Sequence, residues 1–217
     1  TLSDYLHKHG GRLALAEVRD IAIQVCVALK YLNSEELVHR DIKPENIICV
    51  RGKWKLADFG FVAHSGATTF VGSTGYISPE GPGKATADIY SLGKMMYVMA
   101  TGKVVTEYPV FPSWIYDSPD DQNAFKQLNN IIIKAGDDRA ANRYNTTNEV
   151  LKLFLGPGAK NENPRNSVTY VISEFSTRVK AINGTFKRNA LNPQLLMENP
   201  LNFIEEFEKL QKNLYKE

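Results

Sequence analysis

Cysteine, long apolar runs and a secretion signal are scarce or absent in this sequence of 217 residues. The two cysteines, Cys26 and Cys49, each lie inside an apolar run, which favours buried free thiols in a reducing compartment over a disulfide. No apolar run approaches the roughly 18 residues that cross a bilayer, and the first residues lack the charged and apolar regions of a signal peptide. We therefore expect a cytoplasmic chain without a membrane segment.

An excess of charge of one sign is also lacking. The chain carries 26 basic and 24 acidic residues, a formal net charge of +2, and these are scattered along its length. Without a basic stripe, the sequence gives no reason to expect a nucleic acid or an anionic membrane surface as a partner. With 43% hydrophobic residues, the chain can bury one substantial core, so we expect one domain plus an appendage.

The hydrophobic pattern is mainly helical, with one small hairpin. Two short β-branched runs, 46–50 and 53–56, are joined by Arg51-Gly52 and predict the hairpin. A run at 87–101, closed by Gly102, is apolar around most of its circumference, which is typical of a helix in the middle of a core. We predict an irregular segment at 107–121 and helices at residues 2–9, 15–31, 87–101, 123–135 and 146–155.

A boundary is indicated at Gly156-Pro157-Gly158. Beyond it, one apolar stripe runs from 168 to 182, and a second helix is expected to open at Asn199-Pro200, with the asparagine as cap and the proline at the first helical position. The predicted organisation is therefore a domain at 1–155 followed by a helical extension at 156–217.

Four motifs in order carry the chemistry. Residues 39–46 read His-Arg-Asp-Ile-Lys-Pro-Glu-Asn, and Asp-Phe-Gly at 58–60 begins twelve residues after that asparagine. Ser-Pro-Glu follows at 78–80 and Asp-Ile-Tyr-Ser-Leu-Gly at 88–93. Together they resemble the catalytic loop, metal-binding motif, activation segment and central helix of eukaryotic-type Ser/Thr protein kinases, with some wording similar to bacterial members. The resemblance implies the carboxyl-terminal lobe of that fold, a helical bundle with a small hairpin.

The resemblance assigns roles to five residues in phosphoryl transfer. Asp41 would be the catalytic base, and Lys43 would neutralise charge on the transferred phosphoryl group. Asn46 and Asp58 would supply oxygen ligands to Mg²⁺, while Ile48, supported by two methionines of the central helix, would form the floor of the ATP site. Any one of these polar residues alone is more simply part of a solvated turn; the set points to chemistry.

The activation segment offers further candidates. Arg40, beside the base, would pair with a phosphate on this segment, for which Thr68 and Thr69 are candidates together with Ser65, although hydroxyls are common in any exposed loop. Ser73 lies where the family usually has threonine in the substrate-facing loop, and we expect it to hydrogen-bond Asp41 and Lys43. A protein substrate with a Ser or Thr acceptor is implied.

Other matching positions are expected to be structural. For His39 and Phe59 we favour packing against each other, with Asp88 as anchor, over a general-base role for the histidine. Glu80 and Arg143 match a buried ion pair that ties the activation segment to the late helices, and its loss would leave one charge unpaired.

The sequence also departs from the family. No glycine-rich phosphate loop and no strand lysine paired with a helix glutamate occur, so we expect an amino-terminal lobe upstream in the same protein and weak phosphate transfer by the isolated chain. Residues 104–121 replace a helix that many kinases use for substrate docking. The favoured function is transfer of the ATP γ-phosphoryl group to a protein Ser/Thr hydroxyl; the alternative is a non-catalytic half-kinase that acts as a binding or regulatory module.

Overall fold

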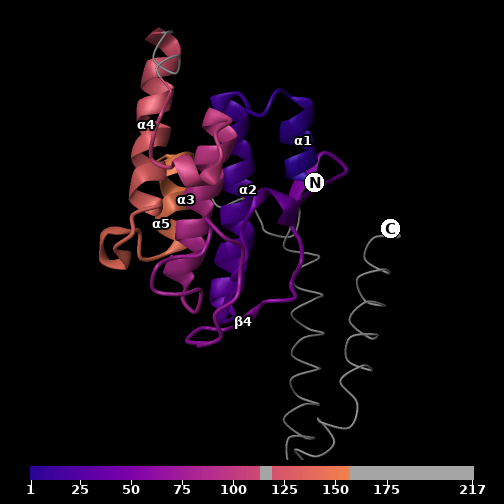
Figure 1. The fold of residues 1–217 in the computed structure, drawn as a ribbon, viewed down its shortest axis with the longest axis vertical. Coiled ribbons are helices and arrows are strands. Elements are labelled where there is room, and N and C mark those ends of the chain that lie inside the picture. The colour runs from indigo at the N-terminus through magenta and orange to yellow at the C-terminus, as the bar shows by residue number, and fades with distance from the viewer. Residues whose placement is uncertain (113–118, 157–217) are drawn as a thin grey trace, which may run out of the picture. The chain divides into compact units, whose positions relative to one another are not determined.

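The computed structural model describes residues 1–112 and 119–156 (Figure 1). These residues form a mainly helical body with two short antiparallel ribbons. The helices are α1 (Leu2–Lys8), α2 (Leu15–Ser34), α3 (Ala85–Thr101), α4 (Pro119–Ala135) and α5 (Thr147–Leu155). The strands are β1 (Leu37–Val38), β2 (Ile47–Val50), β3 (Lys53–Leu56) and β4 (Ala63–His64).

Helix α3 is the centre of the core, as its composition predicts. Nearly every one of its residues is buried, and it contacts both α2 and α4, between which it lies in Figure 1. It ends at Gly102, whose φ of 69° is in the left-handed region that glycine adopts without a steric penalty. Helix α1 begins with a capping box in which Thr1 and Asp4 each satisfy the backbone N–H of the other.

The two ribbons bring separate loops to the same region. Strands β2 and β3 pair with Ile47 opposite Leu56, so the chain returns from β3 to the level at which it entered β2. The turn residues Arg51 and Gly52 both have positive φ, as a two-residue hairpin turn requires. The β1–β4 pair, with Leu37 opposite His64, was not predicted, because strands of two residues leave no periodic signal.

Several element boundaries differ from the prediction. Helix α2 continues to Ser34, α3 begins at Ala85, and α4 begins at Pro119, inside the segment expected to be irregular. Both cysteines are free, but only Cys26 is buried; the prediction was wrong for Cys49, which is exposed because alternate residues of a strand face opposite sides. Along the described ranges, no helix has the length and apolarity that a membrane span requires.

The predicted carboxyl-terminal extension falls outside this description. The apolar stripe at 168–182 and the helix expected from Asn199-Pro200 both lie beyond Gly156, where the described residues end. The division into 1–155 and 156–217 therefore stays a prediction.

Candidate active site

The loop after β1 is fixed to the central helix by one carboxylate. Asp88 of α3 is fully buried, and its two oxygens accept hydrogen bonds of 2.8 Å from the backbone N–H groups of His39 and Arg40. Burial raises the pKa of Asp88 to about 6, although these two hydrogen bonds favour its charged form. Arg40 has a φ of 75°, a left-handed conformation that a non-glycine residue adopts only where its surroundings hold it. The start of the loop is thereby fixed to α3.

Asp41 lies at the centre of a polar cluster. Its Oδ1 accepts a hydrogen bond of 2.8 Å from the Ser73 hydroxyl, and its Oδ2 lies 3.0 Å from the Lys43 ammonium. Lys43 also donates to Ser73 at 2.5 Å, which closes a triangle of three side chains. The Asn46 amide donates to both the backbone oxygen and Oδ2 of Asp41, at 2.8 Å each. The contacts expected between Ser73, Asp41 and Lys43 are therefore present.

The cluster keeps Asp41 ionised. Burial by itself raises the pKa of this carboxyl, but the hydrogen bonds from Lys43 and Ser73 outweigh burial and hold the pKa below its ordinary value. At neutral pH the side chain is an oriented, negatively charged acceptor. It can therefore hold a hydroxyl group and accept a proton when that hydroxyl attacks an electrophile.

Asp58 reaches the same region from the other end of the hairpin. The backbone N–H of Ala57 donates to the Asn46 carbonyl at 2.8 Å, which puts Asp58 next to the residue that holds Asp41. Asp58 is exposed and has a φ of 57°, and its Oδ1 accepts the N–H of Gly60 at 3.2 Å. The hairpin thus brings together residues that lie twelve positions apart in sequence.

The donor set fits a hard divalent cation such as Mg²⁺. The Asn46 amide nitrogen is turned toward Asp41, so its amide oxygen would be the atom to bind a cation, and Asp58 keeps a second carboxylate oxygen beside the one that accepts Gly60 N–H. Mg²⁺ is commonly held by one or two protein oxygens and completes its shell with phosphate and water. Where residues are described, no group of three or more His, Cys, Asp or Glu side chains could hold a metal.

His39 joins the loop that carries Asp41 to the loop that carries Asp58 by packing. Its Nε2 donates to the Ala57 carbonyl at 3.1 Å, and its ring meets Phe59 edge-on, with centroids 5.5 Å apart, rather than in the expected stack. Complete burial lowers the pKa of His39 to about 4, against the Ala57 hydrogen bond and the negative charges of Asp41 and Asp58, which raise it. The ring is neutral at pH 7, and the contacts fit the structural role expected for it.

A pH dependence of stability follows from His39. Between pH 6.5 and about 4 the imidazole of His39 is protonated in the unfolded protein but stays neutral in the folded protein. The free energy of unfolding therefore falls as the pH falls through this range. Relative to His39→Gln, which keeps an N–H donor but cannot titrate, the wild type should lose about 2 kcal/mol between pH 7 and pH 5. Asp88, whose pKa is raised, has the opposite effect on stability as the pH falls. Because Asp88 is present in both proteins, its contribution cancels when the two stability profiles are subtracted. Urea unfolding at each pH measures it; parallel profiles would show that the ring is not held neutral.

Comparison with known proteins decides the family. A sequence model of the protein kinase domain matches residues 1–174 of this chain. The chain belongs to the protein kinase family. It is 34% identical over 166 residues to a probable serine/threonine-protein kinase of Clostridium acetobutylicum (67% of this chain, 25% of that relative) and 32% identical over 177 residues to one of Clostridium perfringens (70% and 25%). A MAP kinase kinase of Saccharomyces cerevisiae is 40% identical over 106 residues (45% and 21%).

The matches cover only part of the relatives and most of this chain. The chain spans about a quarter of the length of the clostridial kinases it matches. The match to the kinase domain runs to residue 174, beyond the boundary expected at 155. Both clostridial proteins are bacterial, which agrees with the similarity of some of the motif sequences to those of bacterial kinases.

Arg40 of this kinase domain contacts the activation segment. Its guanidinium donates to the backbone oxygens of Phe61, at 3.4 Å, and Thr69, and its buried Nε has no hydrogen-bond partner within the described ranges. Thr68 and Thr69 are both exposed. Arg40 is therefore a buried cation that contacts the backbone of this segment at Thr69.

The ion pair between Glu80 and Arg143 joins the segment that precedes α3 to the connection between α4 and α5. Arg143 donates to both carboxylate oxygens of Glu80, at 2.5 and 2.8 Å, and also to three backbone oxygens, those of Thr86, Asp137 and Asp138. The Arg143 side chain is fully buried, whereas Glu80 keeps 29% of its side chain exposed. The pair was expected to be buried as a whole, so that expectation holds only for the arginine.

The hairpin also carries the residue predicted to touch the nucleotide. Ile48 is half-buried on β2, and Met95 and Met99 of α3 are fully buried in the core. This placement is compatible with Ile48 as a half-buried apolar contact and with the methionines as ordinary core residues.

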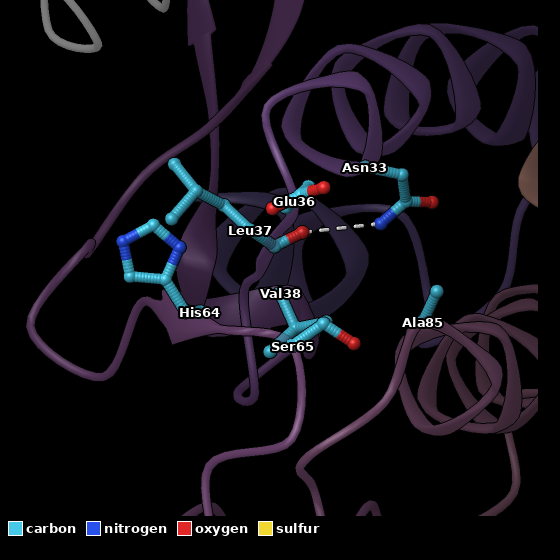
Figure 2. A pocket seen from close by; sticks show the side chains of 7 residues that line it. All are labelled: Asn33, Glu36, Leu37, Val38, His64, Ser65 and Ala85. Atoms are coloured by element: carbon cyan, nitrogen blue, oxygen red, sulfur yellow. Dashed lines mark hydrogen bonds between the residues drawn. The ribbon is translucent and has the colours of Figure 1, made fainter.

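A pocket of about 450 Å³ lies at the β1–β4 ribbon (Figure 2). It is lined by Asn33, Glu36, Leu37, Val38, His64, Ser65 and Ala85, and none of these belongs to the Asp41 cluster. Asn33 is already bonded on both sides, donating to Leu37 O at 3.2 Å and accepting from Thr147 at 2.9 Å. The pocket is the space left where α2, the start of α3 and the β1–β4 ribbon come together.

Proposed function

We propose that the protein is an ATP- and Mg²⁺-dependent kinase that phosphorylates Ser or Thr residues of other proteins, and that residues 1–155 are the carboxyl-terminal lobe of its catalytic domain. The observation that carries this proposal is the closed cluster of Asp41, Lys43 and Ser73, with Asn46 holding the carboxylate. A non-catalytic relative would have no need to keep all these residues in hydrogen-bonded geometry.

Each side chain of the cluster has a separate task. Asp41 orients the acceptor hydroxyl and accepts its proton, while Lys43, 3.0 Å from that carboxylate, is placed to face negative charge on the transferred phosphoryl group. Ser73 links both to the substrate-facing loop at 72–76 and so fixes where an acceptor residue lies. Most of the rate acceleration in phosphoryl transfer comes from such positioning and charge stabilisation.

Asn46 and Asp58 would hold Mg²⁺, and Ile48 would contact the adenine of ATP. A bound Mg²⁺–ATP would supply the phosphoryl group and neutralise its charge. Kinases also use a glycine-rich loop and a strand lysine, for which the sequence contains no motif. We infer that another segment of the same protein supplies them and that this chain alone transfers phosphate weakly. Two free thiols, one of them exposed, favour a reducing compartment such as the cytoplasm.

Phosphorylation of Thr69 should activate the kinase. A phosphate there would give Arg40 a charged partner in place of carbonyl groups and would hold the activation segment in place. Thr69→Ala should lower kcat/KM about tenfold, whereas the matched variant Thr68→Ala should change it less than twofold. Mass spectrometry of the active protein checks whether Thr69 carries the phosphate. Full activity of Thr69→Ala would remove Thr69 from regulation.

The experiment that tests the proposed function is phosphoamino-acid analysis. The protein in its full natural length is incubated with Mg²⁺ and γ-labelled ATP, and its labelled products are hydrolysed. We expect label on phosphoserine or phosphothreonine and its loss on chelation of Mg²⁺. Absence of transfer at every Mg²⁺ concentration would favour the binding or regulatory module instead.

A further inference from the structure

Lys94 is a buried cation that the proposed reaction does not use. It lies in the middle of α3 and is only 6% exposed. Its ammonium is 3.4 Å from the centroid of the Tyr108 ring and 4.7 Å from that of Tyr90. Burying a lysine in an apolar helix is costly unless its charge finds a partner, and two aromatic faces provide one. The residue is therefore held as a cation between two tyrosines.

The charged groups around this cation leave it protonated near neutral pH. Burial lowers the pKa of Lys94 to about 8, Asp138 opposes this shift, and Arg143 adds to it. Asp138 also accepts a hydrogen bond of 3.4 Å from the Tyr90 hydroxyl. Of the two aromatic contacts of Lys94, the one with Tyr108 is the shorter, and it joins α3 to a residue outside this helix.

Tyr108 belongs to the segment that follows α3, residues 104–111. Its hydroxyl donates to Ile133 O of α4 at 3.2 Å, and its ring packs edge-on against Tyr97. A Cβ added at Gly136 would lie 2.7 Å from that hydroxyl, so Tyr108 fills the space beside a residue without a side chain. The ring is thus held between α3 and α4, with Lys94 on its face.

The same segment supports the substrate-facing loop. Val105 lies so close to Gly75 that a Cβ added there would be 2.5 Å from the valine Cγ1. Gly75 is in the turn closed by the hydrogen bond of 3.0 Å from Tyr76 N–H to Ser73 O, and Ser73 bonds Asp41. Contacts therefore run without a break from Lys94 through Tyr108 and Val105 to the loop that meets the acceptor.

We propose that Lys94 is a positioning residue for the binding of the protein substrate, which acts by holding Tyr108 and, through residues 104–108, the loop at 72–76. This inference rests on the proposed kinase function. It assigns a task to residues 104–111, the first part of the segment 104–121 that was expected to replace a docking helix. The aromatic clamp, which is Lys94 held between the rings of Tyr90 and Tyr108, supports the loop from this side.

Steady-state kinetics of the full-length protein test the proposal. Lys94→Met removes the charge but keeps the length of the side chain, and it should raise the KM for a protein substrate about 5- to 30-fold, the range of a desolvated cation–π contact, with the KM for ATP unchanged. Lys94→Arg keeps a cation over the ring and should stay within twofold of the wild type. A purely structural role would lower kcat and stability without this split.

Two further variants separate the effect of moving Tyr108 from a general effect of removing a lysine. Gly136→Ala places a methyl group against the hydroxyl end of Tyr108, with Lys94 intact, and should reproduce the effect on substrate KM by displacing the ring. Lys134→Met is the matched control, because it removes another lysine whose described aromatic contact is with Tyr144, at 4.7 Å from the ring centroid, and not with Tyr108. It should leave both KM values unchanged.

Amide hydrogen exchange measures the coupling between Lys94 and the loop at 72–76 independently of catalysis. Residues 72–78 should exchange about tenfold faster in Lys94→Met and Gly136→Ala than in the wild type, Lys94→Arg or Lys134→Met. If Asp41→Asn abolishes transfer but Lys94→Met changes neither substrate KM nor this exchange, the clamp proposal is overturned and the kinase proposal stands. If wild type and Asp41→Asn are equally inactive, the kinase proposal fails and the exchange alone decides the clamp.

Discussion

Asp41→Asn should lower the kcat for protein phosphorylation by about 10²- to 10⁴-fold, the usual contribution of a positioned base and its charge. Asparagine keeps the shape of the side chain and can still meet Ser73, but it cannot accept a proton and no longer balances Lys43. The KM for ATP should change less than kcat, because Asp41 is not itself one of the expected Mg²⁺ ligands and the backbone oxygen of residue 41 still accepts the Asn46 amide in the variant. Steady-state kinetics on the full-length protein measure both constants.

The control for this variant is Asp20→Asn on the exposed surface of α2, which removes a carboxylate remote from the cluster and should leave kcat unchanged. Circular dichroism and thermal unfolding should show that Asp41→Asn remains folded. A kcat within threefold of the wild type in a folded Asp41→Asn protein would remove Asp41 from the chemistry.

Glu80→Ala should be the most destabilising change in the activation segment. It leaves the guanidinium of Arg143 buried without its carboxylate, and breaking a buried ion pair from one side costs roughly 3–5 kcal/mol. Because Glu80 is 29% exposed, water can enter once it is truncated, and we expect the lower end of that range. Urea unfolding followed by circular dichroism measures the loss of unfolding free energy.

Arg139→Met provides the comparison for Glu80→Ala. Arg139 is exposed and lies four residues before Arg143, so its loss should change stability by less than about 0.5 kcal/mol. A loss below about 1 kcal/mol in Glu80→Ala would mean that the three backbone carbonyl groups bound by Arg143 suffice to hold its charge.

The candidate site was predictable because its residues are linked by a local element. Arg51-Gly52 signals a two-residue hairpin, and a hairpin of known length returns Asp58 to the level of Asn46 whatever the rest of the chain does. The spacing of the motifs therefore carried geometric information. The burial of α3 was likewise readable, since its apolar residues cover most of its circumference.

Features that depend on distant packing could not be read in this way. Cys49 and its apolar neighbours give no sign of which face of the ribbon is covered, and Glu80 gives no sign that it remains partly exposed. Lys94 in an apolar helix suggests an anomaly but not its partner, because Tyr108 lies beyond the helix end and meets Lys94 only after the chain turns at Gly102. Tertiary contacts of this kind leave no periodic pattern in the sequence.

The central claim is that Asp41 and Asp58 serve one phosphoryl-transfer site. It is tested most directly by labelling a protein substrate with γ-labelled ATP and Mg²⁺, using the full-length wild type, Asp41→Asn and Asp58→Ala side by side. The account predicts strong labelling by the wild type and almost none by either variant. Equal labelling by all three proteins would contradict it.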